Sequence, residues 1–488
     1  MDALELARWQ FGITTVYHFI LVPLTIGLSI LVAIMQTAWY RTGKEKWLRM
    51  TKFFGKLLLI NFALGIATGI VQEFQFGMNW SEYSRYVGDV FGAPLAMEAL
   101  AAFFLESTFL GLWIFGWDRL KPKVHLATVW LFAIGTNISA YFIIAANSWM
   151  QHPVGAEYNE ETGRAEMTDI WAVLTNNTTL YAFPHVIATS FLVAGTVVAG
   201  IAGAWLVIKQ REIGSKKGTK AQQADRSLYR TSLRFGAVTM LVAGLAVIYT
   251  GDLQAKLMFE QQPMKMAAAE GLCETESGAD FSLLTIGDLS NDCDGVNTLF
   301  AIPGLTSYLA DGDFDSEVKG IEELQAEYEA LYGPGDYSPN LAVTYWSFRF
   351  MIGLGVFSAA LAVAALWLTR KGRSPDQTWF KRLAIVAIPT PFLAASFGWI
   401  FTEMGRQPWV VAPNPTGADP IYLQTLFGVS EAVSVTEVAI SMTVFTVVYG
   451  ILGVFWYRLM VRYAVEGAPE IEPAPKGDAA DRPLTFAY

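Results

Sequence analysis

Ionisable side chains lie inside several long apolar segments of this chain, where each of them needs a chemical reason. A carboxylate at the centre of a membrane helix costs about 2.5–3.5 kcal/mol. Glu98 and Glu106 share one such segment, and a helix would separate them by about 12 Å along its axis. Two roles remain open for this pair: a structural hydrogen-bond cluster between helices, or a relay of exchangeable protons.

The histidines are few, and their positions are informative. The chain has four. His18 and His185 fall near the same end of two different apolar segments, whereas His125 starts a segment at the opposite end and His152 follows one. A single membrane histidine is more often packed and hydrogen-bonded than it is a ligand. Two at one depth on different helices favour a bound cofactor.

Four more side chains fall at this depth. Arg349 and Met351 lie near the end of one apolar segment, and Glu403 and Arg406 end another on one helical face. Imidazole, thioether and carboxylate groups can ligate heme iron, and arginines can neutralise heme propionates. These residue types therefore favour a heme site near one surface of the membrane.

The histidine count excludes two classes of heme protein. A heme–copper oxidase needs more than four histidines for its hemes and copper. A bis-histidine diheme cytochrome b needs close pairs of histidines on two helices, and the successive separations here are 107, 27 and 33 residues. A transporter or channel with polar gates remains open, and so does a heme protein with mixed ligands.

The composition predicts that the elements holding these residues are membrane helices. The 488 residues are 53% hydrophobic and only 16% charged, against about 25% charged in an average soluble protein. This excludes nucleic-acid binding and ordinary cytosolic enzymes as first interpretations. The chain is expected to be an all-α integral membrane protein, with Pro389 and Pro391 kinking its eighth span. The nine predicted spans are 12–39, 53–75, 93–117, 125–149, 182–208, 233–250, 343–368, 383–403 and 429–457.

The connections between these spans alternate in charge. Segments 40–52, 118–124, 209–234 and 370–382 carry five, three, eight and five Lys or Arg. The segments that alternate with them, 76–92, 150–181 and 404–428, carry one each, and the large connection 251–342 carries three over its much greater length. The positive-inside rule therefore predicts an N-terminus outside and a C-terminus in the cytoplasm.

The large outer connection separates the chain into parts. Spans one to six occupy 1–250, the extracytoplasmic loop 251–342, and spans seven to nine 343–460. The loop has 18 Asp or Glu against three Lys, and a short amphipathic helix is expected at 317–332. Cys273 and Cys293 both fall in it, where a disulfide between them is predicted. The tail 461–488 is expected to be a disordered cytoplasmic segment.

At these residues the chain resembles subunit I of the cytochrome bd quinol oxidases, which are bacterial terminal oxidases of respiratory electron transport. The resemblance covers nearly the whole chain, and the GRQPW string with its upstream Glu is the most specific part. It is carried by RWQFGITTVYHFILVPLTIG (8–27), GDVFGAPLAMEALAAFFLESTFLGLWIFGWDRL (88–120), GTNISAYFIIAANSWMQHPVGAE (135–157), YWSFRFM (345–351) and GWIFTEMGRQPW (398–409).

The resemblance implies three hemes. His185 and Met351 match the axial ligands of a low-spin heme b, and His18 and Glu403 match the ligands of a high-spin heme b and a heme d. Which of the two high-spin sites holds heme d stays open. Three more positions match residues beside the hemes: Glu98, as a ligand or proton donor, and the arginines Arg349 and Arg406.

The resemblance also implies paths for protons and for quinol. Glu106, Ser107 and Ser139 match a proton path from the inside. Lys265 and Glu270, in the string QQPMKMAAAE (261–270), match residues of the family's quinol-binding loop. On a helix these two would lie about 140° apart. An ammonium could hold a quinone oxygen while a carboxylate acts as base.

The expected function is that of the catalytic, heme-bearing subunit of a quinol:dioxygen oxidoreductase in the bacterial plasma membrane. The resemblance implies electrons passing from quinol at the outer face through the low-spin heme to the high-spin pair, where dioxygen becomes water. Protons taken from the inside would make the reaction electrogenic without pumping. It also implies a partner subunit II and a small single-helix accessory subunit. A cofactor-free transporter gated by Glu98 and Glu106 is the alternative.

Overall fold

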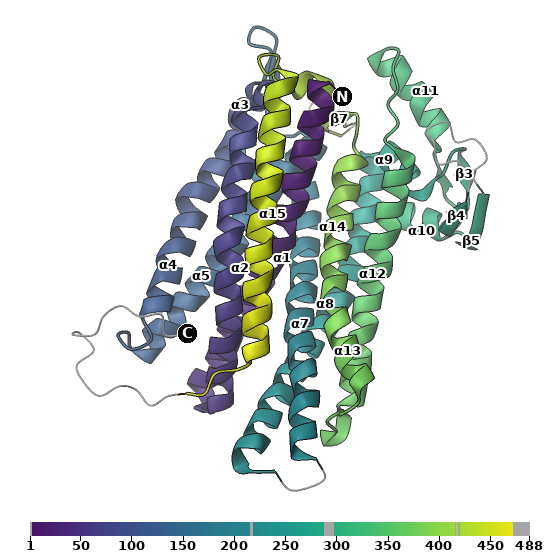
Figure 1. Ribbon diagram of the computed structural model, residues 1–488. Coiled ribbons are helices and arrows are strands. Elements are labelled where there is room, and N and C mark those ends of the chain that lie inside the picture. Colours follow the sequence, from purple (N-terminus) through teal and green to yellow (C-terminus); the bar gives the residue numbers. More distant parts are fainter. Residues whose placement is uncertain (1, 215–217, 287–296, 415, 418–419, 472–488) are drawn as a thin grey trace.

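The computed structural model describes residues 2–214, 218–286, 297–414, 416–417 and 420–471. In this part of the chain nine helical spans are long and apolar enough to cross a membrane, which confirms the predicted all-α class and span number. They stand roughly side by side in one bundle (Figure 1). They are α1 (Ala3–Thr42), α2 (Glu45–Gly77), α3–η1–α4 (Ser81–Met97, Glu98–Phe103, Phe104–Phe115), α5 (Pro122–Gln151), α7 (Asn177–Ile213), α8 (Lys220–Gln261), α12 (Leu341–Leu368), α13–α14 (Thr378–Ala387, Pro389–Met404) and α15 (Val435–Glu466).

Two spans are interrupted. The eighth is broken between α13 and α14 at Ile388, directly before Pro389, as expected from a residue that lacks a backbone N–H. The third span contains the π-helical turn η1, which the sequence did not predict. The sixth span is the longest single helix in the described part of the chain: α8 continues beyond residue 250 to Gln261. The outer loop therefore begins later than expected.

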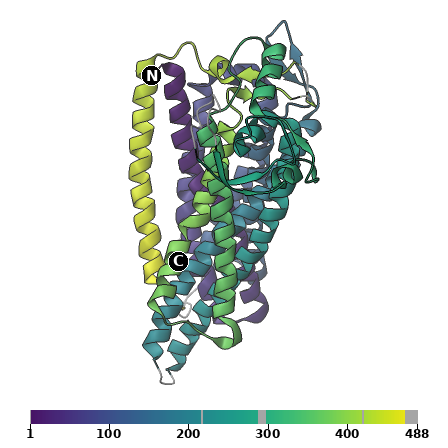
Figure 2. The same ribbon diagram turned by 90° about the vertical axis from the view of Figure 1, so that its right-hand side faces the viewer.

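The loop between α8 and α12 folds into short elements at one end of the bundle (Figure 2). The predicted amphipathic helix is present as α11, although two-stranded sheets were not foreseen. The loop contains α9 (Pro263–Glu270), β3 (Glu276–Ser277), β4 (Phe281–Ile286), β5 (Asn297–Ile302), α10 (Leu305–Asp311), β6 (Glu317–Val318) and α11 (Ile321–Tyr332). Strands β3 and β6 pair antiparallel, as do β4 and β5.

The remaining short elements lie in other connections. Strand β1 pairs with β2, and β7 pairs with β8, both antiparallel. The elements are β1 (Ala156–Asn159), β2 (Arg164–Met167), α6 (Ile170–Leu174), η2 (Arg370–Gly372), β7 (Trp409–Val411), β8 (Leu423–Gln424) and η3 (Thr425–Gly428).

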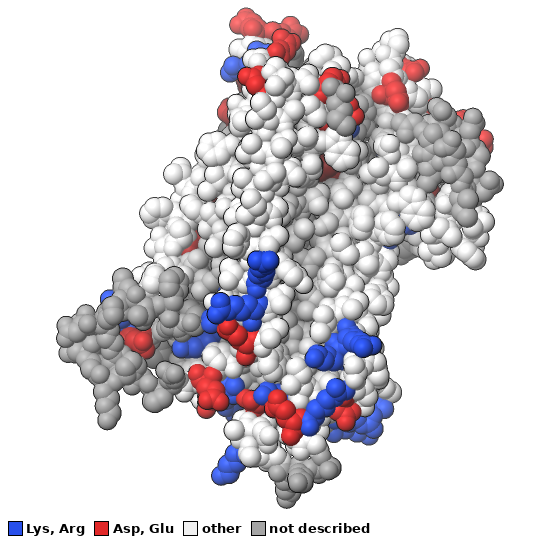
Figure 3. Space-filling model, in the orientation of Figure 1, with Lys and Arg blue, Asp and Glu red and all other residues white. Residues whose placement is uncertain are grey.

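The two ends of the bundle differ in the sign of their charged side chains. On the face drawn in Figure 3, most Lys and Arg lie near the lower end, the upper end carries mainly Asp and Glu, and the middle is largely uncharged. The end of α7, the start of α8 and the start of α13 lie at the lower end, and α9 and α11 at the upper end (Figure 1). This distribution agrees with the charge alternation in the sequence. The orientation in the membrane stays a prediction.

The end of the chain differs from the expected disordered tail. Helix α15 continues to Glu466, past the predicted boundary at 460. Beyond it, the Ala468 amide donates to the Tyr229 hydroxyl at 2.9 Å, and Arg49 donates to the Pro469 carbonyl at 2.8 Å. These contacts hold the start of the tail against the bundle, so disorder from residue 461 was wrong. Residues 472–488 lie outside the described part, as does Cys293, and the disulfide stays a prediction.

Candidate functional site

A large cavity lies where His185 and Met351 meet inside the bundle. Its volume is about 140 Å³, and both side chains line it. Its other lining residues come from α1, α5, α7, α8, α9, α12 and α14. The structure thus brings together a histidine and a methionine that lie 166 positions apart in the chain. Most of the wall is apolar, as expected of a cofactor pocket.

Two glycines make room beside these two side chains. A Cβ at Gly398 would lie 2.8 Å from the Met351 sulfur, and one at Gly251 would lie 3.3 Å from His185 Cε1. The Nδ1 atom of His185 is hydrogen-bonded to the Thr250 hydroxyl at 3.0 Å. Because that bond occupies one ring nitrogen, Nε2 is left as the ligating atom. The donors and the space beside them therefore fit a heme with His and Met axial ligands.

The residues expected at the high-spin hemes each have a partner of their own. Nδ1 of His18 is hydrogen-bonded to the Thr68 hydroxyl at 2.8 Å, which leaves its Nε2 for a ligand. Glu403 accepts a hydrogen bond from Asn147 at 3.0 Å and forms an ion pair with Arg406. Arg406 also donates to the Val410 carbonyl at 2.6 Å.

The carboxylates of the third span both face α5. Glu98 accepts a hydrogen bond from Ser139 at 2.6 Å, and the side chain of Glu106 packs against Gly135, one turn further along α5. Eight residues of regular α-helix would turn them about 80° apart. The π-turn η1 lies between them and inserts an extra residue, which brings them back toward one face. Ser107, in contrast, is exposed on α4 and donates to the Phe104 carbonyl.

Lys265 and Glu270 lie on α9, a short helix that starts abruptly. The backbone of Gln262 is non-helical, with φ −138° and ψ 64°, and Pro263 follows it, so α8 ends there and α9 begins at the proline. Both side chains are buried. Nζ of Lys265 donates to Gln151 Oε1 at 3.2 Å, and it lies 5.2 Å from the centre of the Phe401 ring. Burial lowers the pKa of Lys265 to about 7; nearby Arg406 adds to the lowering and Glu403 opposes it.

Glu270 points to a different partner, as its angular separation from Lys265 requires. It forms a buried ion pair with Arg349, with Oε2 and Nη2 2.7 Å apart. Arg349 also donates to the carbonyls of Ala269 and Ser282. Burial raises the pKa of Glu270, and Arg349 opposes that shift. Arg349, expected beside a heme propionate, thus has its guanidinium contacts in the outer loop.

A chain of hydrogen bonds joins α9 to the end of α14. Gln151 accepts from Lys265 and donates to Asn147 Oδ1 at 2.9 Å, and Asn147 donates in turn to Glu403. Gln151 and Asn147 are one turn apart on α5. This chain connects the expected quinol-loop lysine with an expected heme ligand.

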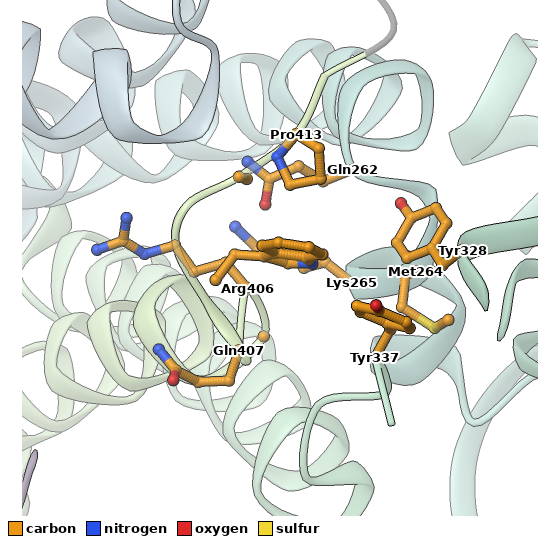
Figure 4. Close-up of a pocket in the computed structure, with 11 residues that line it drawn as sticks. Gln262, Met264, Lys265, Tyr328, Tyr337, Arg406, Gln407 and Pro413 are labelled. Carbon is orange, nitrogen blue, oxygen red and sulfur yellow. The ribbon is translucent and has the colours of Figure 1, made fainter. Parts of the chain in front are cut away.

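A second, smaller pocket lies on the other side of Lys265, and that residue lines both pockets. Its volume is only about 20 Å³. Figure 4 shows side chains from the loop and from the segment after α14 facing one another around it. Its lining residues are Gln262, Met264, Lys265, Tyr328, Tyr337, Gly405, Arg406, Gln407, Trp409, Ala412 and Pro413.

Several of these residues were not singled out in the sequence. Gln262 lies in the string QQPMKMAAAE and Trp409 in GRQPW, so the strings themselves marked them. Gln151 and Thr250 are polar residues at the ends of apolar runs, and Thr68 is a polar residue within one; none carries a further sequence signal. Their partners come from other helices, and only the folded bundle reveals them.

Comparisons with known proteins agree on one family. The family model "Cytochrome bd terminal oxidase subunit I" matches residues 6–468. The chain is 44% identical over 468 residues to cytochrome bd ubiquinol oxidase subunit 1 of Bacillus subtilis (strain 168), covering 96% of this chain and 95% of that protein. It is 34% identical over 522 residues to cytochrome bd-II ubiquinol oxidase subunit 1 of Escherichia coli (strain K12), covering 95% and 96%. The structure of bd oxidase from Geobacillus thermodenitrificans matches with a TM-score of 0.81 at 27% identity, covering 95% of this chain and 99% of that one.

Proposed function

Since this chain belongs to the cytochrome bd terminal oxidase subunit I family and is a subunit of a respiratory quinol oxidase, we propose that it carries the hemes and oxidises quinol at the end of the bundle where α9 lies. Membership in an oxidase family decides against the cofactor-free transporter. The observation that carries the proposal is the cavity lined by both His185 and Met351, with Lys265 at its edge.

His185 and Met351 hold the low-spin heme b in this cavity. The hydrogen bond between His185 Nδ1 and the Thr250 hydroxyl fixes the orientation of the imidazole, and Gly398 leaves room for the thioether. When bound, the hemes take electrons singly and use them to reduce dioxygen to water. The protein's part is to set the ligands, exclude water and deliver protons.

His18 and Glu403 hold the two high-spin hemes, one a heme b and the other heme d, with Glu98 beside them. The support is the family match at these positions and their local geometry. Thr68 orients His18, and Asn147 with Arg406 orients the Glu403 carboxylate. Arg406 also balances the negative charge there.

Lys265 holds the quinol oxygen on which negative charge develops. Lys265 lines both the small pocket and the larger cavity, so a quinol bound to it would lie next to the electron acceptor. Glu270 belongs to the same site: its Oε2 is bound to Arg349, and its buried Oε1 has no hydrogen-bond partner among the described residues. Through Arg349, Glu270 also fixes the C-terminal end of α9, the helix that carries Lys265 near its start.

Protons for water formation come from the cytoplasm by way of Glu106, with Ser107 and Ser139 along the path. Glu106 is buried and lies deeper in the third span than Glu98. The basic connections at that end of the bundle support an inner location. Protons from quinol leave at the opposite, outer face, so each turnover separates charge without a pump.

The chain works in the bacterial plasma membrane with other subunits. Being a subunit I, it implies a subunit II, and a small single-helix accessory subunit is part of the proposal. Its helices α12 and α15 expose mainly apolar side chains. Lipid and partner helices are the surfaces such faces fit.

The proposal is tested with the oxidase purified with its partner subunits. Wild type is expected to show heme absorption, including the far-red band of a chlorin, and quinol-dependent oxygen uptake. His185→Ala and Met351→Ala should each remove the low-spin signal and leave the high-spin bands. A folded but colourless wild type, or an unchanged low-spin spectrum in both variants, would overturn it.

A further inference from the structure

The strand pair β4–β5 carries apolar side chains that face away from the rest of the protein. Neither strand contains a charged residue, although the connection 251–342 has 18 Asp or Glu. Phe300 is 63% exposed and Leu299 is 52% exposed. The large apolar side chains that this strand pair exposes are Leu283, Leu299, Phe300 and Ile302. Exposed apolar side chains that lie together indicate a contact surface.

Other side chains of β4 pack against α12 and fix the position of the strand pair along that helix. The hydroxyls of Ser282 and Thr285 each donate to the Tyr345 hydroxyl at 2.9 Å. The Phe281 ring contacts the Phe348 ring, with ring centres 6.4 Å apart. Tyr345 and Phe348 both belong to α12. Strand β4 therefore lies beside this part of the helix.

This part of α12 lies inside the N-terminal end of the span. The helix starts at Leu341, so Tyr345 and Phe348 lie about 6 and 10 Å along it at 1.5 Å per residue. At the same depth α12 exposes the apolar side chains of Val343 and Phe350. Figure 1 agrees, because β4 and β5 lie beside the bundle and lower than α9 and α11. The exposed side of the strand pair is therefore level with a face of α12 that suits lipid.

The free edge of β5 limits how deep the strand pair can lie. Strand β5 pairs with β4 on one edge, and its other edge pairs with no strand in the described part of the chain. Unpaired backbone N–H and C=O groups are not tolerated in the hydrocarbon core of a membrane. The edge must therefore reach water or lipid head groups while the apolar side chains reach the acyl chains. This combination fits the membrane interface, where amphipathic elements lie about 5–10 Å deep.

We propose that the strand pair β4–β5 is a membrane anchor of the loop, with its four exposed apolar side chains in contact with the phospholipids of the leaflet at the α9 end of the bundle. Lipid is the occupant because the surface continues the exposed apolar face of α12 and offers no charged side chain to specify a protein partner. The inference requires only that the spans cross a membrane. It depends neither on the hemes nor on the place where quinol binds.

The anchor also braces the loop where it meets α12. Arg349 donates to the Ser282 carbonyl at 2.6 Å and to the Ser282 hydroxyl at 3.1 Å. The same guanidinium holds Glu270 on α9. Lipid on the outer side of β4 keeps this strand against α12, and so keeps Arg349 between β4 and α9.

The test replaces Phe300 by the photoreactive residue p-benzoylphenylalanine in the holoenzyme complex. The complex is reconstituted in vesicles of phosphatidylcholine and phosphatidylglycerol and illuminated, and the loop peptides are analysed by mass spectrometry. Phospholipid adducts are expected at position 300. If this variant does not assemble with its partner subunits, the same residue at Leu283, which is also exposed on the strand pair, gives the same test.

The matched control places the same photoreactive residue at Leu331. This side chain is 70% exposed, about as much as Phe300, but it lies on α11, which projects beyond α9 (Figure 1). It should give no phospholipid adduct. Adducts of position 300 with a peptide of a partner subunit would make the surface a protein interface and overturn the inference. Absence of any phospholipid adduct at position 300, or equal yields at positions 300 and 331, would overturn it as well.

Discussion

Replacing Gly398 by alanine should displace the Met351 sulfur without unfolding the chain. The added Cβ would lie 2.8 Å from the sulfur and 3.3 Å from Cγ. Carbon and sulfur atoms in ordinary contact need about 3.5–4.0 Å, so the sulfur must move by about 1 Å. The methionine side chain is unbranched and can rotate away. Overpacking of this kind costs about 1–3 kcal/mol, and the better helix propensity of alanine returns about 1 kcal/mol.

The assay is the absorption spectrum and midpoint potential of the low-spin heme in the purified complex. A thioether ligand raises the potential, so a displaced sulfur should lower it and weaken the low-spin band. Gly353→Ala is the control, because a Cβ at Gly353 on α12 would meet nothing within 4 Å. An unchanged spectrum and potential in Gly398→Ala would refute the placement of this sulfur in the cavity.

Three more predictions concern the proton path and the quinol loop. Glu106→Gln should slow turnover about 100-fold or more with heme content kept, since the amide cannot relay a proton; turnover at the wild-type rate would make Glu106 structural. Arg349→Leu should destabilise the loop by about 3–5 kcal/mol, because it leaves the buried Glu270 carboxylate unpaired. The double variant Arg349→Leu/Glu270→Leu should therefore unfold at a higher temperature than Arg349→Leu alone. A double variant no more stable than Arg349→Leu would speak against the Arg349–Glu270 ion pair. The Lys265 ammonium, with its pKa lowered to about 7 by burial, is present below that pH and lost above it, so kcat/KM for quinol should fall as pH rises past 7. Lys265→Arg, which stays charged, should flatten that fall, and the same fall in the variant would assign it to another group.

The spans were predictable because length and hydropathy determine which segments can cross a membrane. The end of α8 was not, since hydropathy drops at Asp252 and Lys256 while the helix continues. Those two side chains form an ion pair one turn apart with Nζ and Oδ1 2.6 Å from each other, which suits a helix leaving the apolar region. The π-turn η1 has no sequence signature, because it is a change in hydrogen-bond register among ordinary residues.

The residues of the candidate site were predictable from the sequence, but most of their hydrogen-bond and ion-pair partners were not. The predicted spans and the charge alternation of their connections placed His185 and Met351 at one depth in the membrane. The structure adds the cavity that both side chains line. The ion pair of Glu270 with Arg349 depends on how α9 folds back onto α12, which no local pattern encodes. The same holds for the hydrogen bond of Lys265 to Gln151.

The most direct test of the account compares two electron donors in Lys265→Ala. Oxygen uptake is measured with a quinol and with an artificial one-electron donor that bypasses the quinol site. Loss of a charged hydrogen bond of about 1.5–3 kcal/mol should cut the quinol-dependent rate about 10- to 100-fold. All three hemes and the rate with the artificial donor should be retained. Quinol oxidation at the wild-type rate with an unchanged Michaelis constant would contradict the account.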